Sequence, residues 1–190
     1  MDIRNQLPKV KSRETQLKQE KVSWILDQHV ETNHFYDEYL PYEFHLRMVF
    51  QAYKDWKHLL NEKLSYECYF AAWGHDVIED TRANYNDVKK VLGVEVAEII
   101  RAVTNYGRGR DRDERMPDFV YEDIRNTPGA TFVKLCDRIA NVQYSKMTKS
   151  SMFEKYKKEN DHFFKMLGYS DSHELKPMFD YLQNLFYSKN

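Results

Sequence analysis

The sequence predicts an all-α fold, a compact bundle of about eight to ten helices. Apolar side chains recur at intervals of three and four residues along most of the chain, which is typical of helices with one buried face. Glycine and proline stand where several of these runs end, as at Gly93 and Pro128. With 190 residues, 42% of them hydrophobic, the chain is long enough for one domain with a sizeable core and too short for two.

The predicted helices follow one another along the chain. A polar leader of about a dozen residues precedes a first amphipathic helix, in which His29 takes a core or edge position without a ligand role. The second and third helices carry His45 and His75. Further helices are expected at residues 84–92, 94–104, 117–127, from Pro128 onward, 154–167 and 173–187.

Composition excludes several classes of protein. The 29 basic and 30 acidic residues nearly cancel, whereas a dedicated nucleic-acid binder is plainly basic. No apolar run approaches membrane-spanning length, and the first residues lack the apolar core of a signal peptide. Cys68 and Cys136 fall on apolar helix stripes, as small buried residues do in a reducing compartment. We therefore expect a cytoplasmic protein that binds a small molecule, and neither nucleic acid nor a membrane.

A dense group of polar side chains follows the third helical run. His75, Asp76, Glu79 and Asp80 occupy six consecutive positions, and all four are metal-ligand or proton-transfer types. Adjacent residues of a continuous helix point to different sides, so His75 and Asp76 share one ion only if the backbone bends near them. Gly74 stands immediately before the pair and permits such a bend.

A second carboxylate lies in an otherwise apolar helix. Asp137 sits within residues 132–142, where an unpaired charge is costly. Arg138 is the nearest cation in sequence, but adjacent residues of a helix point to different faces, so it does not face the same side as Asp137. A bound metal is therefore the better partner for Asp137.

His45 completes a predicted set of ligands. It lies at one end of a core-facing stripe, and His75 lies on a similar stripe of the next helix. Either histidine alone is as well explained by a hydrogen-bonded core residue. Together with Asp76 and Asp137, the two histidines predict one divalent metal ion, because four unrelated buried polar groups would each need a separate partner.

This order of residues resembles a known family. A His, then a His-Asp pair, then an Asp is the pattern of HD-domain metal-dependent phosphohydrolases. Residues 71–81, 85–88, 92–100 and 128–141 are also similar to the hydrolase domain of the Rel/SpoT enzymes. The length and the lack of a synthetase domain make the chain most similar to the small alarmone hydrolases, which remove pyrophosphate from the 3′ position of (p)ppGpp. The resemblance implies one HD hydrolase domain over residues 1–190, with its core at about 14–168.

The chain departs from this family just before His45. There the family carries an Arg and a Lys that help to grip the substrate, whereas residues 33–42 contain neither and include Asp37 and Glu38. Metal chemistry is expected to survive this change. A different or less charged nucleotide becomes an alternative to guanosine tetraphosphate.

Roles for the acidic residues follow from the predicted metal. Mixed nitrogen and oxygen ligands suit one Mn²⁺ ion, and the resemblance points the same way, although Fe, Co, Ni or Zn would also bind. Glu79 and Asp80 lie within one turn of His75 and Asp76 and are not needed as ligands. They are predicted to be the general base and the water-orienting group. The alternative is that they are surface carboxylates near a helix start.

Five further residues are predicted to bind the substrate. Lys134 and Asn141 share a helix face with Asp137, and Tyr156 lies where the resemblance places a base-stacking tyrosine. Arg108 and Arg110 belong to a mixed-charge loop that is either a solvated surface or a clamp for phosphate oxygens.

The predicted function is Mn²⁺-dependent hydrolysis of the 3′-pyrophosphate of an alarmone, (p)ppGpp or a (p)ppApp-type relative. The alternatives are an HD-type nucleotidase or phosphodiesterase, and a nucleotide sensor without turnover.

Overall fold

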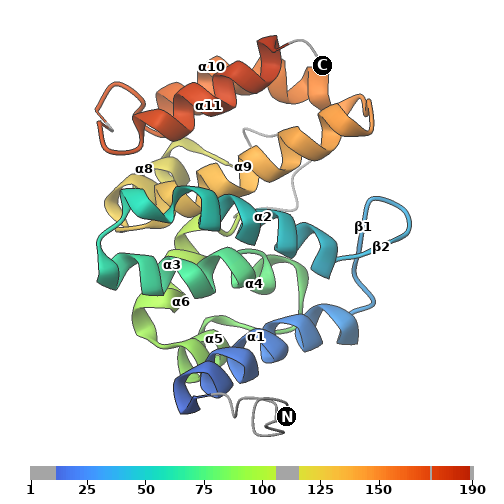
Figure 1. Cartoon of the computed structure of the whole chain (residues 1–190), viewed down its shortest axis with the longest axis vertical. Coiled ribbons are helices and arrows are strands. Elements are labelled where there is room, and N and C mark those ends of the chain that lie inside the picture. The colour runs from blue at the N-terminus through green and yellow to red at the C-terminus, as the bar shows by residue number, and fades with distance from the viewer. Residues whose placement is uncertain (1–11, 106–115, 172, 189–190) are drawn as a thin grey trace, which may run out of the picture.

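The computed structural model describes residues 12–105, 116–171 and 173–188, and over these the chain is helical apart from one short hairpin (Figure 1). The predicted all-α fold is confirmed. The described residues form nine helices of eight residues or more and the single turn α4. The helices are α1 (Arg13–Glu31), α2 (Glu43–Trp56), α3 (Glu62–Gly74), α4 (Val77–Asp80), α5 (Tyr85–Leu92), α6 (Val94–Val103), α8 (Asp118–Asn126), α9 (Ala130–Met147), α10 (Met152–Met166) and α11 (Lys176–Tyr187), with a 3₁₀ turn at Lys57–Leu59.

Helix α9 lies at the centre of the bundle. It packs against α2, α3, α6, α8, α10 and α11, and most of its side chains are buried. Figure 1 shows the helices stacked along the long axis, from α10 and α11 at one end to α1 and α5 at the other. Helices α2, α3 and α9 also pack against one another in pairs. These are the helices that carry the predicted metal ligands.

A two-stranded hairpin, β1 (Phe35–Tyr36) and β2 (Leu40–Pro41), joins α1 to α2, and the helical periodicity did not predict it. Asn33 ends α1 in the left-handed conformation, with φ 53°. The Asn33 amide donates to the carbonyl of Val30 and the His34 amide to that of His29, which is the Schellman pattern of helix ends. The chain therefore turns sharply, and the hairpin begins beside α2.

The helix is interrupted at His75 and Asp76, which form a turn between α3 and α4, as predicted. Helix α3 ends at Gly74 and α4 begins at Val77. The end of α3 at Gly74 is as predicted, although the φ of this glycine is not positive. A Cβ there would come 2.9 Å from Ile100 Cδ1, so a larger residue would have to displace the end of that side chain where α3 packs on α6.

Two other predicted boundaries have different outcomes. Helix α5 begins with a capping box made by Asn84 and Asp87 and stops at Gly93, as predicted. Pro128, by contrast, does not lie in the first turn of α9. That helix begins after Gly129, which has φ 86° and whose Cβ would come 2.8 Å from Cys68 Sγ.

Both cysteines, Cys68 and Cys136, are buried and free, in line with their positions on apolar stripes. None of the described helices is long and apolar enough to cross a bilayer.

Candidate metal centre and active site

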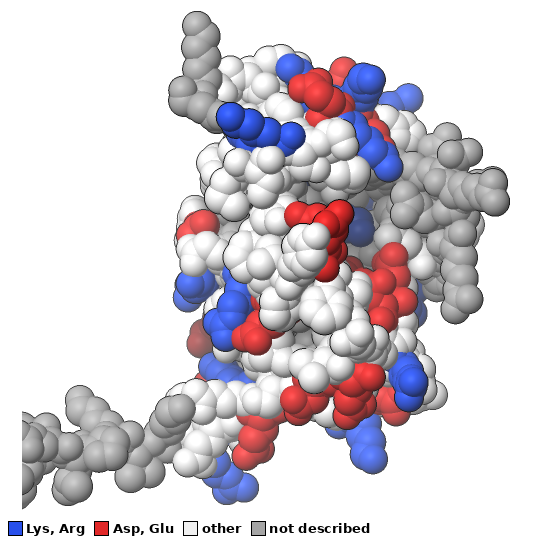
Figure 2. Space-filling model, turned by 90° about the vertical axis from the view of Figure 1, so that its right-hand side faces the viewer, with Lys and Arg blue, Asp and Glu red and all other residues white. Residues whose placement is uncertain are grey.

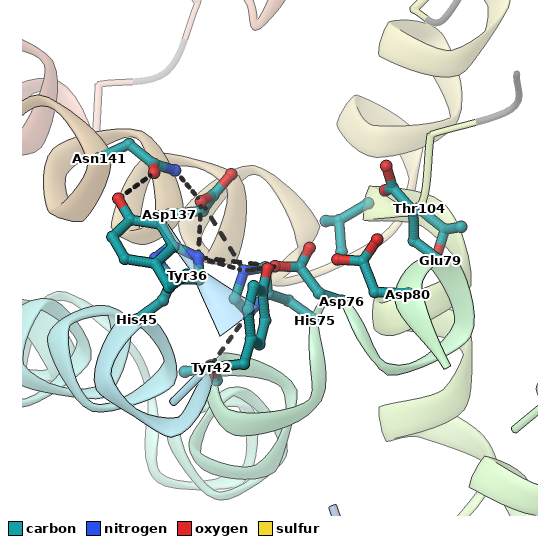
Figure 3. A network of polar contacts seen from close by, with 12 residues as sticks. Tyr36, Tyr42, His45, His75, Asp76, Glu79, Asp80, Thr104, Asp137 and Asn141 are labelled. Carbon is teal, nitrogen blue, oxygen red and sulfur yellow. Dashed lines mark hydrogen bonds and ion pairs between the residues drawn. The ribbon is translucent and has the colours of Figure 1, made fainter. Parts of the chain in front are cut away.

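Three of the predicted ligands converge in the interior. His45 comes from α2, His75 from the end of α3, and Asp137 from the middle of α9. The two imidazole Nε2 atoms lie 3.2 Å apart, and Asp137 Oδ1 is 3.4 Å from that of His45 and 3.7 Å from that of His75. One ligand atom from each residue lies within 4.8 Å of the others. Figure 3 shows the three side chains pointing at one another.

Asp76 lies at the edge of this group. Its Oδ2 is 2.8 Å from His75 Nε2 and 3.5 Å from His45 Nε2. The same oxygen accepts a short hydrogen bond from the hydroxyl of Tyr42. The Tyr42 ring is in turn stacked on His34, with ring centroids 3.8 Å apart. Tyr42 thereby helps to orient the Asp76 carboxylate, a common arrangement around metal ligands.

The charges of this group are tightly linked. Burial opposes a charge on His45, but hydrogen bonds to Asp137 and Asp76 raise its pKa to about 9. Burial likewise opposes the charge of Asp137, and His45 and Lys134 nevertheless lower its pKa to about 2. The pKa of Asp76 is also well below its usual value, because His75 and His45 outweigh the effect of burial. Two carboxylates and an imidazolium thus share this pocket.

The donor set fits a divalent cation. The Nδ1 atom of His75 lies 3.3 Å from the carbonyl of Ala72, so it donates there and leaves the Nε2 lone pair facing His45 and Asp137. Two imidazole nitrogens and carboxylate oxygens are ligands for Mn²⁺, Fe, Co, Ni and Zn alike. A cation there would replace the proton that His45 otherwise carries between the two acids.

Metal affinity is therefore expected to depend on pH. An imidazole must be neutral to ligate, so below its pKa of about 9 the His45 proton competes with the cation. Affinity should rise about tenfold per pH unit from pH 7 to 9 and then level off. Titration calorimetry with Mn²⁺, in buffers of different ionisation enthalpy, should count about one proton released at pH 7. An affinity that stays constant over this range would contradict the assignment of His45.

The structure separates the two acids predicted for catalysis. The Asp80 carboxylate lies beside Asp76 (Figure 3), and its Oδ2 is 3.8 Å from His34 Nε2. Burial, and then the charges of Asp76 and Glu79, raise the pKa of Asp80 to about 7. Glu79 is exposed, and its two oxygens accept hydrogen bonds from the backbone and side-chain nitrogens of Asn105 at 3.0 and 2.9 Å. Asp80 therefore has the environment of a general base.

The face of α9 that carries Asp137 also carries two predicted substrate residues. Lys134 is buried, with Nζ 3.7 Å from Asp137 Oδ2 and 3.3 Å from the carbonyl of Val103. Asn141 donates to Asp137 Oδ1 at 2.5 Å and accepts from the hydroxyl of Tyr36 at 2.9 Å. The Tyr36 ring stacks on His45 at 4.7 Å. The hairpin thus closes one side of the ligand group.

Two cavities lie on either side of Asn141 and Tyr156, which line both. One, of about 130 Å³, is also lined by Lys134, Asp137 and Arg138. The other, of about 170 Å³, is mostly aromatic and polar, with Tyr36, Tyr144 and Met152 in its wall. The centre therefore has a cationic side and an aromatic side.

Two predicted residues, Arg108 and Arg110, lie outside the described residues. The face that carries the hairpin is seen in Figure 2, where acidic side chains gather near the middle and basic ones lie mainly towards the edges. Among the described residues, the cations nearest the ligand group are thus recessed ones such as Lys134.

Sequence reasoning missed Tyr36, Tyr42 and Asn105 as parts of this centre. Tyr42 stands three residues before His45 at the start of the same helix, and that spacing was a signal that it faces the same way. Tyr36 and Asn105 reach the centre only because the hairpin and the end of α6 fold back towards it, and local spacing carries no sign of this.

Comparison with known proteins identifies relatives of the chain. No family model matches it. Over 94 residues it is 35% identical to the bifunctional (p)ppGpp synthase/hydrolase SpoT of Escherichia coli, a match that covers 45% of this chain and 13% of that protein. Over 73 residues it is 33% identical to a guanosine-3′,5′-bis(diphosphate) 3′-pyrophosphohydrolase of Drosophila melanogaster, which covers 38% of this chain and 40% of the relative.

The structural similarity to a solved protein extends over more of the chain than the sequence similarity does. A solved structure, described as a metazoan ortholog of SpoT that hydrolyses ppGpp, matches 95% of this chain and 97% of its own with a TM-score of 0.63 and 19% identity. The matching sequence spans 40% or less of the two relatives above. The resemblance seen in the sequence is confirmed: the chain is homologous to part of the (p)ppGpp hydrolases and has the helical fold of the metazoan one.

Proposed function

We propose that the protein hydrolyses the 3′-pyrophosphate of an alarmone nucleotide, (p)ppGpp or a (p)ppApp-type relative, with Mn²⁺ as its metal. A water oxygen bonds to the phosphorus nearest the ribose, the bond from that phosphorus to the 3′ oxygen breaks, and this oxygen takes up a proton to become the 3′ hydroxyl. The products are pyrophosphate and a nucleoside 5′-phosphate. The observation that carries this proposal is the convergence of His45, His75 and Asp137 beside Lys134, in a chain homologous to pyrophosphohydrolases.

The residues of the chain have separate tasks in this reaction. His45, His75, Asp76 and Asp137 would hold a divalent cation, which when bound polarises a phosphoryl oxygen and acidifies water. Asp80 accepts the proton of the attacking water, and its pKa of about 7 suits that role near neutral pH. Glu79, held in place by Asn105, orients the same water. Lys134 and Arg138 offset the charge of the phosphates.

The two cavities support a nucleotide as the substrate. The cationic cavity suits the 3′-pyrophosphate, because it contains Lys134 and adjoins Asp137. The aromatic cavity suits a nucleoside, whose base stacks on tyrosine rings such as Tyr36 or Tyr156. Asn141 stands between them, where its amide reaches the ribose.

An HD-type nucleotidase or phosphodiesterase would use the same ligands. A panel of substrates separates these functions: (p)ppGpp, (p)ppApp, NADPH and deoxynucleotides, each incubated with the protein and Mn²⁺, with products resolved by chromatography. Pyrophosphate from the first two supports the proposal. Orthophosphate or a nucleoside monophosphate as the only product indicates the nucleotidase or phosphodiesterase. Binding without any product indicates a sensor.

A further inference from the structure

The aromatic cavity contains a single acidic side chain among its described lining residues, that of Asp37. The other side chains that matter there are the tyrosines Tyr36, Tyr144 and Tyr156 and the amide Asn141. A cavity built to hold phosphates would carry cations instead. Its chemistry suits an uncharged aromatic group that donates hydrogen bonds.

Two features hold the Asp37 carboxylate in this wall. The residue lies in the hairpin turn with φ 57°, a left-handed conformation that Asp and Asn adopt more readily than most residues. Its Oδ2 accepts a hydrogen bond of 2.8 Å from the hydroxyl of Tyr144 on α9. The Tyr144 ring in turn meets the edge of Tyr36, with centroids 4.9 Å apart. The carboxylate is thus tied to the same α9 face that carries Asn141.

The carboxylate keeps acceptor capacity after this bond. An ionised carboxyl group accepts at about four lone-pair sites and donates at none. Guanine offers two adjacent N–H donors, N1–H and the 2-amino group, at a spacing that matches two carboxylate oxygens. Adenine offers one amino donor next to the N1 acceptor, and that acceptor repels a carboxylate. Asp37 is exposed, so the discrimination comes from the two hydrogen bonds that guanine gains and from the repulsion between the carboxylate and the adenine N1 lone pair.

We propose that Asp37 is a specificity-determining residue that accepts hydrogen bonds from the base, so that the site selects guanine over adenine. This inference rests on the nucleotide substrate proposed above and decides between its two alarmone classes. The assignment also accounts for an acidic residue in a site that binds a polyanionic nucleotide. Asp37 faces the base, and the phosphates lie in the second cavity, on the other side of Asn141 and next to Lys134.

Binding of nucleoside diphosphates to the full chain with Mn²⁺ tests this assignment by calorimetry. The wild type should bind GDP about tenfold or more tighter than ADP, with IDP, which lacks the 2-amino group, between them. Asp37→Asn should lower the ratio of GDP affinity to ADP affinity about tenfold, because the side-chain amide cannot accept hydrogen bonds from both N–H donors of guanine. Asn keeps an acceptor for Tyr144 and tolerates the left-handed backbone, so the cavity is preserved.

Glu38→Gln is the matched control. Glu38 is exposed in the same turn and does not line the cavity, so its loss removes one negative charge and should leave the ratio unchanged. Equal binding of GDP and ADP by the wild type overturns the role of Asp37. The role of Asp37 is also overturned if Asp37→Asn leaves the ratio of GDP affinity to ADP affinity unchanged, or if Glu38→Gln lowers that ratio equally. If the wild type binds none of the three nucleotides, the role of Asp37 in base selection is overturned, whereas the proposed function fails only if no pyrophosphate is released from (p)ppGpp or (p)ppApp.

Discussion

Replacing Asp137 with alanine is expected to remove the bound metal and to abolish hydrolysis. Asp137 Oδ1 lies within 3.7 Å of both imidazole Nε2 atoms, and no other carboxylate on α9 faces them among the described residues. Loss of a partner outside the ligand shell already costs about 10–100-fold in metal affinity, so loss of a ligand should cost more than about 100-fold. Titration with Mn²⁺ and an assay of pyrophosphate release measure the two effects.

A folding defect must be separated from this loss. The helical circular dichroism of Asp137→Ala should stay near that of the wild type, because the surrounding α9 residues pack in the apolar core. Glu122→Ala, which removes an exposed acid from α8, is the matched control and should keep metal and activity. Full activity in Asp137→Ala would show that the cation is held elsewhere.

Replacing Asp80 with asparagine is expected to lower kcat by roughly 100-fold or more while the metal and the substrate still bind. Asp80 is partly buried beside Asp76, and its pKa of about 7 makes it a base that gains activity as pH rises and loses it as pH falls. A bound cation favours the ionised carboxylate and so opposes the rise in the pKa of Asp80. The kcat of the wild type should therefore begin to decline at about pH 7 or lower as the pH falls. The acidic limb of the kcat profile should disappear in the variant.

Glu79→Gln is the comparison for this result. Glu79 is exposed and bonded through both oxygens to Asn105, and Gln can keep the acceptor half of that contact. Its kcat should therefore fall less than that of Asp80→Asn, with the acidic limb unchanged. If Asp80→Asn turns over at the wild-type rate and Glu79→Gln does not, the roles of the two acids are reversed.

The sequence by itself determined the fold class and the ligand candidates. Both depend on local periodicity: helical spacing put His45 and His75 on core-facing stripes, and an Asp within the apolar run of α9 required a cation. The break after Gly74 was also predictable, because adjacent residues of an unbroken helix cannot share an ion. The close approach of Ile100 to Gly74 was not predictable, because it depends on how α3 packs against another helix.

Only the tertiary structure decided which polar groups meet around those ligands. Tyr36 reaches His45 and Asn141 because the hairpin folds back on α9, a contact across 105 residues of chain. Asp37 meets Tyr144 in the same way, across 107 residues. Glu79 and Asp80 are neighbours in sequence but have different surroundings. The single turn α4 places Asp80 beside Asp76 and Glu79 beside Asn105. Spacing along one helix fixes which residues share a face, but contacts between distant segments depend on how the whole bundle packs.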